Sequence, residues 1–558
     1  MGRIPSDPDC QRRTNHACRG AACYGNTRTD FRVSQRPGTY SDAIALGIVT
    51  TMLHRLLNAL ILLPDRYCYQ VPADLGLCAD EVAFPNAQGE ILHGFWFKPG
   101  GQAMASEIPQ DEAPVVLFCP GTSGNLSSHL YYVELLCRAG CAVLSVDYTG
   151  FGQSAGQASL HTLVPDLLCT SNFLCREKDV QAFGIFGISL GANLALLVAS
   201  QRQEARAVAA EGLALYGEIT RGVLADGIMG PRDVTTVTYE NRLPVARKHH
   251  VLNQRRVSGW LARTLAWAGM TFFPFAGKDP REPARLLTDT PVLCIHGVDD
   301  PLLPFEGTLQ VYGALPGAKQ LWLIPEVSHP QEAALAQDGE YVAQLARFFH
   351  AALRGHAHVT TPAITSQLVP QGPESYILHL HNAGAPGLVL TTVVSEQDLA
   401  CRTVWVQNAA ELSVHAPGRL PTVSCLPLFE VDGDSDRAHI RYTPRGQQYR
   451  TIFRPIIREL SQMLHERRLH DLEALLHTLP HERPEPPFDF FLGVYCVQIM
   501  QRTRQKMPCL AQAAAQVFTR YWHYGPDAEP PGQPTLWALA AEVSGQQVSQ
   551  SRSTHVGR

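Results

Sequence analysis

The middle of the chain alternates between short apolar runs and longer segments whose apolar residues recur every three to four positions. Short apolar runs predict strands that are buried on both faces, and the longer segments predict helices that cross over between them. The predicted strands are 115–119, 141–146, 183–186, 208–216, 291–296 and 320–324, and the predicted helices are 131–139, 160–178 and 192–201. This alternation indicates an α/β fold, in which a mostly parallel sheet has helices on both faces.

Two segments depart from the alternation. Residues 80–99 alternate between polar and apolar positions on both sides of the turn-forming residues 86–89, which predicts an antiparallel hairpin. Between about 217 and 290 no strand–helix pattern is visible, although the segment is rich in tryptophan and phenylalanine. A long segment of this kind is often a cap over a site, and its aromatic side chains are expected to pack within the cap. We therefore predict one α/β domain over residues 67–355.

The N-terminal region is predicted to contain a polar, disordered arm over residues 1–40 and an apolar amphipathic helix within 41–66. The apolar stretch 43–63 has the length of a membrane span, but its polar residues form one narrow stripe that includes Arg55. An arginine near the middle of a span is costly, so spanning is the least favoured interpretation. Packing on the protein and lying in a membrane interface both stay open.

The region after the α/β domain has a different pattern. Residues 360–374 contain proline and glutamine and predict a linker. Residues 375–445 show short alternating runs typical of a small β-rich module, and 451–523 contain long helical patterns. We predict a C-terminal module over 375–525, whose role the sequence does not identify, and a disordered tail over 526–558.

Composition narrows the functional classes. The chain has 558 residues, which indicates two or three domains, and a net charge of −5, which offers no basic field for nucleic acid. Its 15 cysteines include no CxxC pair, so we expect reduced thiols, no structural zinc and no other metal or cofactor. With no secretory signal recognisable in the polar first 40 residues, we expect a cytoplasmic protein, with peripheral membrane contact through 43–63 as an option.

The strongest chemical signal is the segment Gly187-Ile188-Ser189-Leu190-Gly191, a G-x-S-x-G motif between a predicted strand and a predicted helix. A serine in a sharp turn of this kind is typical of a nucleophile elbow, in which the flanking glycines relieve crowding. The following helix presents its N-terminal N–H groups to developing negative charge. We predict that Ser189 is a nucleophile.

A serine nucleophile needs a base, and the base needs an acid that orients it. Asp300 lies in the acidic loop after strand 291–296, and His329 lies in the loop after strand 320–324. The order Ser189, Asp300, His329 is the order that this architecture requires. Asp299 stays open as the alternative acid, and His296 is expected to be structural.

An oxyanion hole should come from the loop after strand 115–119 and from the residue after the nucleophile. The backbone N–H groups of Thr122 and Leu190 are the candidate donors. Pro120 precedes Gly121 in this loop.

Residues about 70–352 resemble the α/β-hydrolase superfamily, nearest to its lysophospholipase-like and dienelactone-hydrolase-like serine hydrolases. The matching sequence motifs are the G-x-S-x-G elbow, the loop 147–154 (DYTGFGQS) and the entry segment 73–77 (ADLGL) with the 94–96 motif (GFW). The resemblance implies hydrolysis of an ester, thioester or amide through an acyl-enzyme, without metal or organic cofactor. The entry segment resembles members with an N-terminal membrane-associated helix.

We therefore predict a serine hydrolase that acts on a small-molecule or lipid ester or thioester. The same three residues could serve an acyltransferase or a serine peptidase. A third option is a vestigial hydrolase domain in a scaffold that binds a partner through residues 375–525. The sequence does not indicate an oligomeric state.

Overall fold

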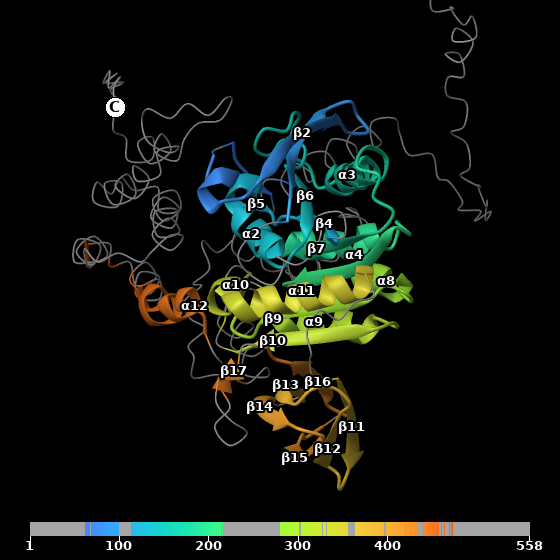
Figure 1. Cartoon of the computed structure of the whole chain (residues 1–558), viewed down its shortest axis with the longest axis vertical. Coiled ribbons are helices and arrows are strands. Elements are labelled where there is room, and N and C mark those ends of the chain that lie inside the picture. The colour runs from blue at the N-terminus through green and yellow to red at the C-terminus, as the bar shows by residue number, and fades with distance from the viewer. Residues whose placement is uncertain are drawn as a thin grey trace, which may run out of the picture. The chain divides into compact units, whose positions relative to one another are not determined.

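The computed structural model (Figure 1) describes most of residues 58–471, and its longest gaps are 100–112, 216–278 and 355–362. Several sequence predictions lie outside the described residues: the arm 1–40, most of the helix 43–63, most of the cap 217–290, and the chain after 471. The end of the predicted helix 41–66 is corrected. Residues Leu63–Pro64 form a short strand, β1, which pairs with β5 (Ser123–Gly124).

An eight-stranded sheet organises the described N-terminal part, with the strand order β10-β9-β8-β7-β4-β6-β3-β2. The strands from β10 to β6 are parallel to their neighbours, and β3 and β2 are added antiparallel. The predicted hairpin 80–99 is confirmed as β2 and β3. The strands are β2 (Ala79–Pro85), β3 (Ile91–Phe97), β4 (Val115–Cys119), β6 (Ala142–Val146), β7 (Phe183–Ile188), β8 (Ala205–Glu211), β9 (Val292–Gly297) and β10 (Lys319–Ile324).

One predicted strand was misplaced. The run 208–216 was expected to be extended throughout, whereas β8 covers Ala205–Glu211. The strand ends where Gly212 takes a left-handed conformation with φ 72° and donates its N–H to the Ile295 carbonyl at 2.9 Å. The strand therefore ends before the last residues of the predicted run.

Helices cover both faces of the sheet, and alternate strand residues face each layer. In β4, Leu117 and Cys119 contact the layer that contains α3, α4, α8 and α9, while Val116 and Phe118 contact the layer of α2, α10 and α11. The helices are α2 (Leu130–Arg138), α3 (Leu163–Glu177), α4 (Leu190–Ala199), α8 (Arg281–Leu286), α9 (Phe305–Ala314), α10 (Glu332–Ala336) and α11 (Asp338–Arg354). None of the helices among the described residues is long and apolar enough to cross a membrane.

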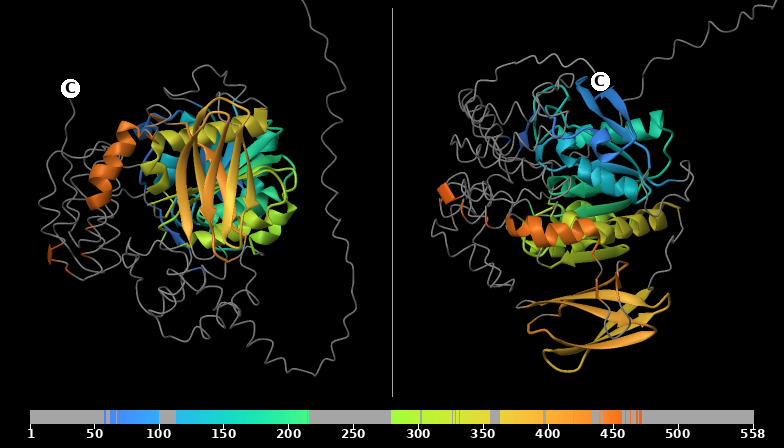
Figure 2. Two further views of the ribbon diagram at one scale, coloured as in Figure 1. Left: turned by 90° about the horizontal axis from the view of Figure 1, so that it is seen from below. Right: turned by 60° about the vertical axis from the view of Figure 1, so that its left-hand side comes forward.

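Downstream of α11, the chain forms two three-stranded antiparallel sheets, β11-β12-β15 and β14-β13-β16 (Figure 2). Leu378, Leu380, Val389 and Val406 form their shared core. The β-rich module is thus confirmed, but the predicted linker 360–374 is wrong because β11 (Ile364–Pro370) occupies it. This edge strand is largely exposed, so its sequence does not show the alternation of apolar and polar residues that predicts a half-buried strand. The other strands are β12 (Ser375–Asn382), β13 (Gly387–Val394), β14 (Leu399–Val406), β15 (Ala409–His415) and β16 (Thr422–Pro427), followed by the pair β17 (Val431–Asp432) and β18 (His439–Ile440).

The β-rich module is not a separate body joined only by a tether. Ser424 Oγ donates to the Leu321 carbonyl of edge strand β10 at 2.7 Å, and Gln344 Nε2 of α11 donates to the Pro427 carbonyl at 2.6 Å. Leu388 and Leu426 of the module belong to the same apolar core as α2 and α11. Burial of this shared core couples the stability of the module to that of the sheet.

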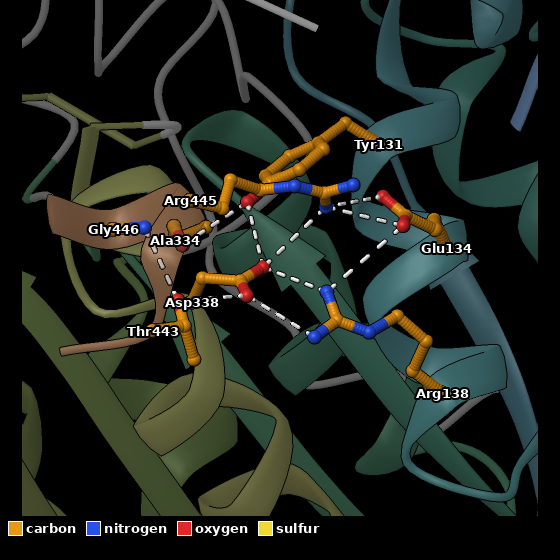
Figure 3. A network of polar contacts seen from close by, with 8 residues as sticks. All are labelled: Tyr131, Glu134, Arg138, Ala334, Asp338, Thr443, Arg445 and Gly446. Carbon is orange, nitrogen blue, oxygen red and sulfur yellow. Dashed lines mark hydrogen bonds and ion pairs between the residues drawn. The ribbon is translucent and has the colours of Figure 1, made fainter. Parts of the chain in front are cut away.

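A polar network fixes the segment after the module against α2 and α11 (Figure 3). Asp338 pairs with Arg138 at 2.7 Å and with Arg445 at 3.5 Å, and Arg445 also pairs with Glu134 at 3.1 Å. Arg445 precedes Gly446 within α12 (Pro444–Gln448), and the Arg445 guanidinium lies over the Tyr131 ring. Each of these charged groups is paired with a group of opposite charge, and these pairs offset the free-energy cost of removing the charges from water.

Candidate active site

Ser189 lies at the sharp turn between β7 and α4, as the sequence predicts. Its backbone has φ 54° and ψ −122°, which is a strained conformation for a residue with a side chain. The Ser189 N–H donates to the Glu211 carbonyl of β8 at 2.8 Å, which fixes the turn against the neighbouring strand. The side chain therefore leaves the end of β7 at the N-terminus of a ten-residue helix.

The glycines that flank Ser189 are required by close backbone approach. A Cβ on Gly187 would lie 2.1 Å from the Gly191 carbonyl oxygen, and a Cβ on Gly191 would lie 2.1 Å from the Cys119 carbonyl oxygen. Neither backbone neighbour can move aside as a flexible side chain could. The motif spacing therefore reflects the packing of α4 against β7 and β4.

We predict that Gly191→Ala lowers the free energy of unfolding by about 3 kcal/mol or more, because the added methyl overpacks a backbone contact. Gly313→Ala is the matched control, since a Cβ at Gly313 in α9 meets nothing within 4 Å. Alanine is the better helix former, so this control should be neutral or stabilising by up to about 1 kcal/mol. Chemical denaturation of both variants measures the difference, and equal effects would contradict the packing argument.

The acid and the histidine are in direct contact. His329 Nδ1 lies 2.8 Å from Asp300 Oδ2, and Asp300 Oδ1 accepts the Leu303 N–H at 2.8 Å. Burial disfavours the Asp300 carboxylate, but the charge and hydrogen bond of His329 outweigh it, and the pKa of Asp300 is held below its ordinary value. An ionised Asp300 accepts from Nδ1–H, which leaves His329 Nε2 as the basic nitrogen. Of the two adjacent aspartates, Asp300 contacts His329.

His296 supports the same loop from the buried side, consistent with the structural role expected for it. Its Nδ1 lies 2.6 Å from Thr308 Oγ1, and its Nε2 lies 2.8 Å from the Leu303 carbonyl oxygen and 3.7 Å from Asp300 Oδ2. These contacts fix the acidic loop beside Asp300.

The elbow and the histidine loop meet at Gly212. A Cβ on Gly212 would lie 2.7 Å from Pro330 Cγ and 3.7 Å from the Ser189 backbone nitrogen. Pro330 follows His329, so the structure brings the His329 loop and the Ser189 elbow to the same point at the end of β8. A side chain at Gly212 would require Pro330 to shift.

The predicted oxyanion residues belong to two segments that adjoin Ser189. Leu190 begins α4, and Thr122 follows Gly121, whose Cβ position would lie 3.6 Å from Ser189 Cβ. The loop after β4 therefore passes beside the serine. Tyr148 donates its hydroxyl to the Pro120 carbonyl at 3.1 Å and anchors the start of this loop.

Sequence reasoning missed Glu211, a carboxylate that is 1% exposed at the end of β8. Its Oε2 accepts the Tyr341 hydroxyl at 2.5 Å. Burial raises the pKa of Glu211 to about 7, against the opposing effects of the Tyr341 and Tyr132 hydroxyls and of nearby His329. The available signal was a glutamate directly after the apolar residues 207–210.

Replacing Glu211 with glutamine should stabilise the protein more at pH 8 than at pH 5. The folded-state pKa is raised, so the native state resists ionisation, and this cost accumulates as pH rises from the ordinary value of 4.5 to about 7. The pKa shift of Glu211 corresponds to about 3 kcal/mol, which is the largest gain in the free energy of unfolding that the substitution can give. Denaturant titrations at both pH values measure it, with exposed Glu282→Gln as the control. A benefit that does not grow with pH would contradict the prediction.

Sequence reasoning also missed His129, the last residue of the short helix η4 (Leu126–His129). Its Nδ1 lies 2.9 Å from the Asn125 carbonyl oxygen, and its Nε2 lies 3.8 Å from the position of a Gly121 Cβ. Burial lowers the pKa of His129, against the hydrogen bond to Asn125. A neutral imidazole therefore faces the loop beside Ser189.

Sequence comparison extends these observations. Residues 110–331 match the family model described as serine aminopeptidase, S33. The uncharacterized protein YfhR of Escherichia coli O157:H7 is 27% identical over 278 residues, covering 49% of this chain and 82% of that protein. Human protein ABHD12B is 26% identical over 210 residues, covering 36% of this chain and 50% of that protein. The Arabidopsis thaliana α/β hydrolase domain-containing protein WAV2 is 27% identical over 123 residues, covering 22% of this chain and 37% of that protein.

Among solved structures, the Pyrococcus furiosus esterase Pf2001 is similar with a TM-score of 0.38 and 18% identity, over 52% of this chain and 98% of that one. The matched family segment contains the Ser189 elbow, the Asp300 loop and His329. These three residues follow the carboxyl ends of β7, β9 and β10, which belong to the parallel part of one sheet. The described part of residues 110–331 therefore has the α/β-hydrolase fold.

Proposed function

We propose that the chain is a serine hydrolase that cleaves an ester or thioester through a Ser189–His329–Asp300 triad. The observation that supports this most directly is the 2.8 Å contact between His329 and buried Asp300, in a loop that meets the strained Ser189 elbow at Gly212. A serine in a strained turn, a histidine oriented by a carboxylate and a nearby helix N-terminus are the parts that acyl transfer requires.

In the proposed mechanism, His329 Nε2 removes the Ser189 hydroxyl proton as Oγ attacks the substrate carbonyl carbon. The carbonyl oxygen becomes an oxyanion, and the backbone N–H groups of Thr122 and Leu190 stabilise it. Protonated His329 then gives its proton to the leaving alcohol or thiol, which leaves an acyl-enzyme on Ser189. His329 then takes a proton from water as the water attacks this ester, and returns that proton to Ser189 Oγ as the bond to the acyl carbon breaks and the carboxylic acid leaves.

Asp300 stays ionised through this cycle. Its depressed pKa means that it remains an acceptor for Nδ1–H at neutral pH and stabilises the imidazolium that forms during attack. The buried position of Asp300 strengthens this interaction because little water screens it.

The second candidate is a serine peptidase on the same three residues. It is favoured by the description of the matching family, a serine aminopeptidase. Comparing aminoacyl anilides with p-nitrophenyl esters of increasing acyl length separates the two candidates. An acyltransferase is distinguished by product analysis with competing alcohols or amines.

The test of the proposed function is covalent labelling with a fluorophosphonate, which phosphonylates activated serines. We expect one stoichiometric label, mapped by mass spectrometry to the peptide that contains Ser189. Heat-denatured protein is the control, because an unfolded serine is not activated. No label on the native chain would contradict the proposal and favour a vestigial domain that serves as a scaffold.

A further inference from the structure

Residues 63–66 with 68–69 form a strap along the loop that follows β4. The Leu63 N–H donates to the Thr122 carbonyl at 2.9 Å, and the Asp65 N–H donates to the Gly124 carbonyl at 3.3 Å. These bonds make the short parallel pairing of β1 with β5. The strap thus holds a carbonyl of Thr122, the residue whose N–H is the candidate oxyanion donor, and restricts rotation of that residue.

Asp65 ties the strap to two other segments, at Asn125 and Gly152, and also bonds to Tyr69 within the strap. Its Oδ1 accepts Asn125 Nδ2 at 2.8 Å, and its Oδ2 accepts the Tyr69 hydroxyl. Its carbonyl accepts the Gly152 N–H at 2.9 Å. The Tyr69 N–H in turn donates to Ser127 Oγ at 2.9 Å, so both ends of the strap contact the loop.

Asn125 passes this restraint toward the serine. Its Oδ1 accepts the Ser127 N–H at 2.9 Å and caps η4, and its carbonyl oxygen lies 2.9 Å from His129 Nδ1. His129 Nε2 in turn faces the Gly121 position, which lies beside Ser189 Cβ. A continuous series of contacts therefore runs from Asp65 through Asn125 and His129 to the loop at the reacting serine.

We propose that Asp65 is a positioning residue that holds the loop 121–129, and with it the Thr122 N–H, in the geometry that stabilises the oxyanion. The proposal rests on the serine hydrolase function proposed above. Asp65 does not touch the substrate and transfers no proton. Its effect is on kcat, because a misplaced oxyanion donor weakens binding of the transition state more than binding of the substrate.

Asp65→Ala tests the proposal, because it removes the acceptors for Asn125 and Tyr69. Activity is expressed as kcat per serine titrated with fluorophosphonate, so that any unfolded fraction is not counted. We expect kcat to fall by about tenfold, a fraction of the loss on deleting an oxyanion donor, and KM to change by less than about twofold. Asp65→Asn retains an oxygen for the Asn125 amide and should keep most of the activity.

Asp80→Ala is the matched control. It also removes an aspartate from the segment before β4, but among the described residues the Asp80 side chain forms only an exposed pair with Lys98 at 3.1 Å. Its kcat should equal that of the wild type. Tyr69→Phe is the milder second variant should Asp65→Ala fold poorly, and it should lower kcat by about threefold through loss of one hydrogen bond.

The outcomes separate this inference from the proposed function. If the wild type labels and turns over while Asp65→Ala and Tyr69→Phe keep full kcat per titrated serine, the positioning role is wrong and the hydrolase stands. If melting temperature falls without loss of kcat per titrated serine, Asp65 is structural only, which also overturns the inference. If the wild type neither labels nor turns over, the proposed function fails and the positioning role with it.

Discussion

Ser189→Ala should lower kcat/KM for p-nitrophenyl esters by about 10⁴-fold or more, to the level left by binding and oxyanion stabilisation alone. In the proposed mechanism Ser189 Oγ forms the acyl-enzyme, and His329, which Asp300 holds at 2.8 Å, acts only on protons. Alanine carries a Cβ as serine does, so we expect the φ of 54° at position 189 to be about equally costly in both proteins. The melting temperature should therefore change by only a few degrees.

Ser200→Ala is the matched control for this substitution, because Ser200 lies at the other end of the same helix and its Oγ donates to the Leu197 carbonyl at 2.8 Å. It should retain full turnover and full fluorophosphonate labelling. Retained turnover in Ser189→Ala at wild-type levels would remove Ser189 from the mechanism, and loss of turnover in both variants would point to folding rather than chemistry.

Much of the fold follows from local pattern. Strands such as 115–119 are buried on both faces, so an unbroken run of apolar residues identifies their bounds almost to the residue. The Ser189 elbow could also be predicted, because its glycines are required by contacts within and next to the motif. Serine, acid and histidine each follow a different strand, so their order along the chain is the order in which those strands occur in the sequence. The alternation of predicted strands and helices already shows that order.

What could not be predicted depends on contacts between distant segments. Asp65 and Asn125 are 60 residues apart, and Arg445 and Glu134 are 311 residues apart. Neither pair has a local periodicity that marks it. The choice between Asp299 and Asp300 is of the same kind, because adjacent loop carboxylates differ only in which one faces His329, and this is set by the packing of two loops.

Glu211 shows a second reason why sequence alone could not predict the whole site. Its position at the end of an apolar strand is visible in the sequence, but its raised pKa depends on Tyr341, which comes from a helix 130 residues later. A buried carboxylate beside the histidine loop therefore has consequences for the pH dependence of stability that no motif indicates.

Asp300→Asn should lower kcat by about 10³- to 10⁴-fold while KM changes little. Asp300 Oδ1 accepts the Leu303 N–H at 2.8 Å, so the single oxygen of asparagine should stay with that donor. The amide nitrogen then faces His329 Nδ1, where the carboxylate oxygen Oδ2 lies in the wild type. A donor at this place forces Nδ1 to accept, which moves the proton to Nε2 and leaves His329 unable to take the Ser189 proton.

Asp299→Asn separates this effect from a general change of charge in the loop. Asp299 neighbours Asp300, and its backbone N–H donates to the Val327 carbonyl at 2.8 Å, a bond that the substitution keeps. We expect Asp299→Asn to retain kcat within about threefold, because it leaves the His329 proton on Nδ1. Fluorophosphonate labelling should follow the same order, slow in Asp300→Asn and near normal in Asp299→Asn. The reverse order would mean that Asp299 orients the base, and equal losses would mean that the loop needs both charges rather than one acceptor for His329.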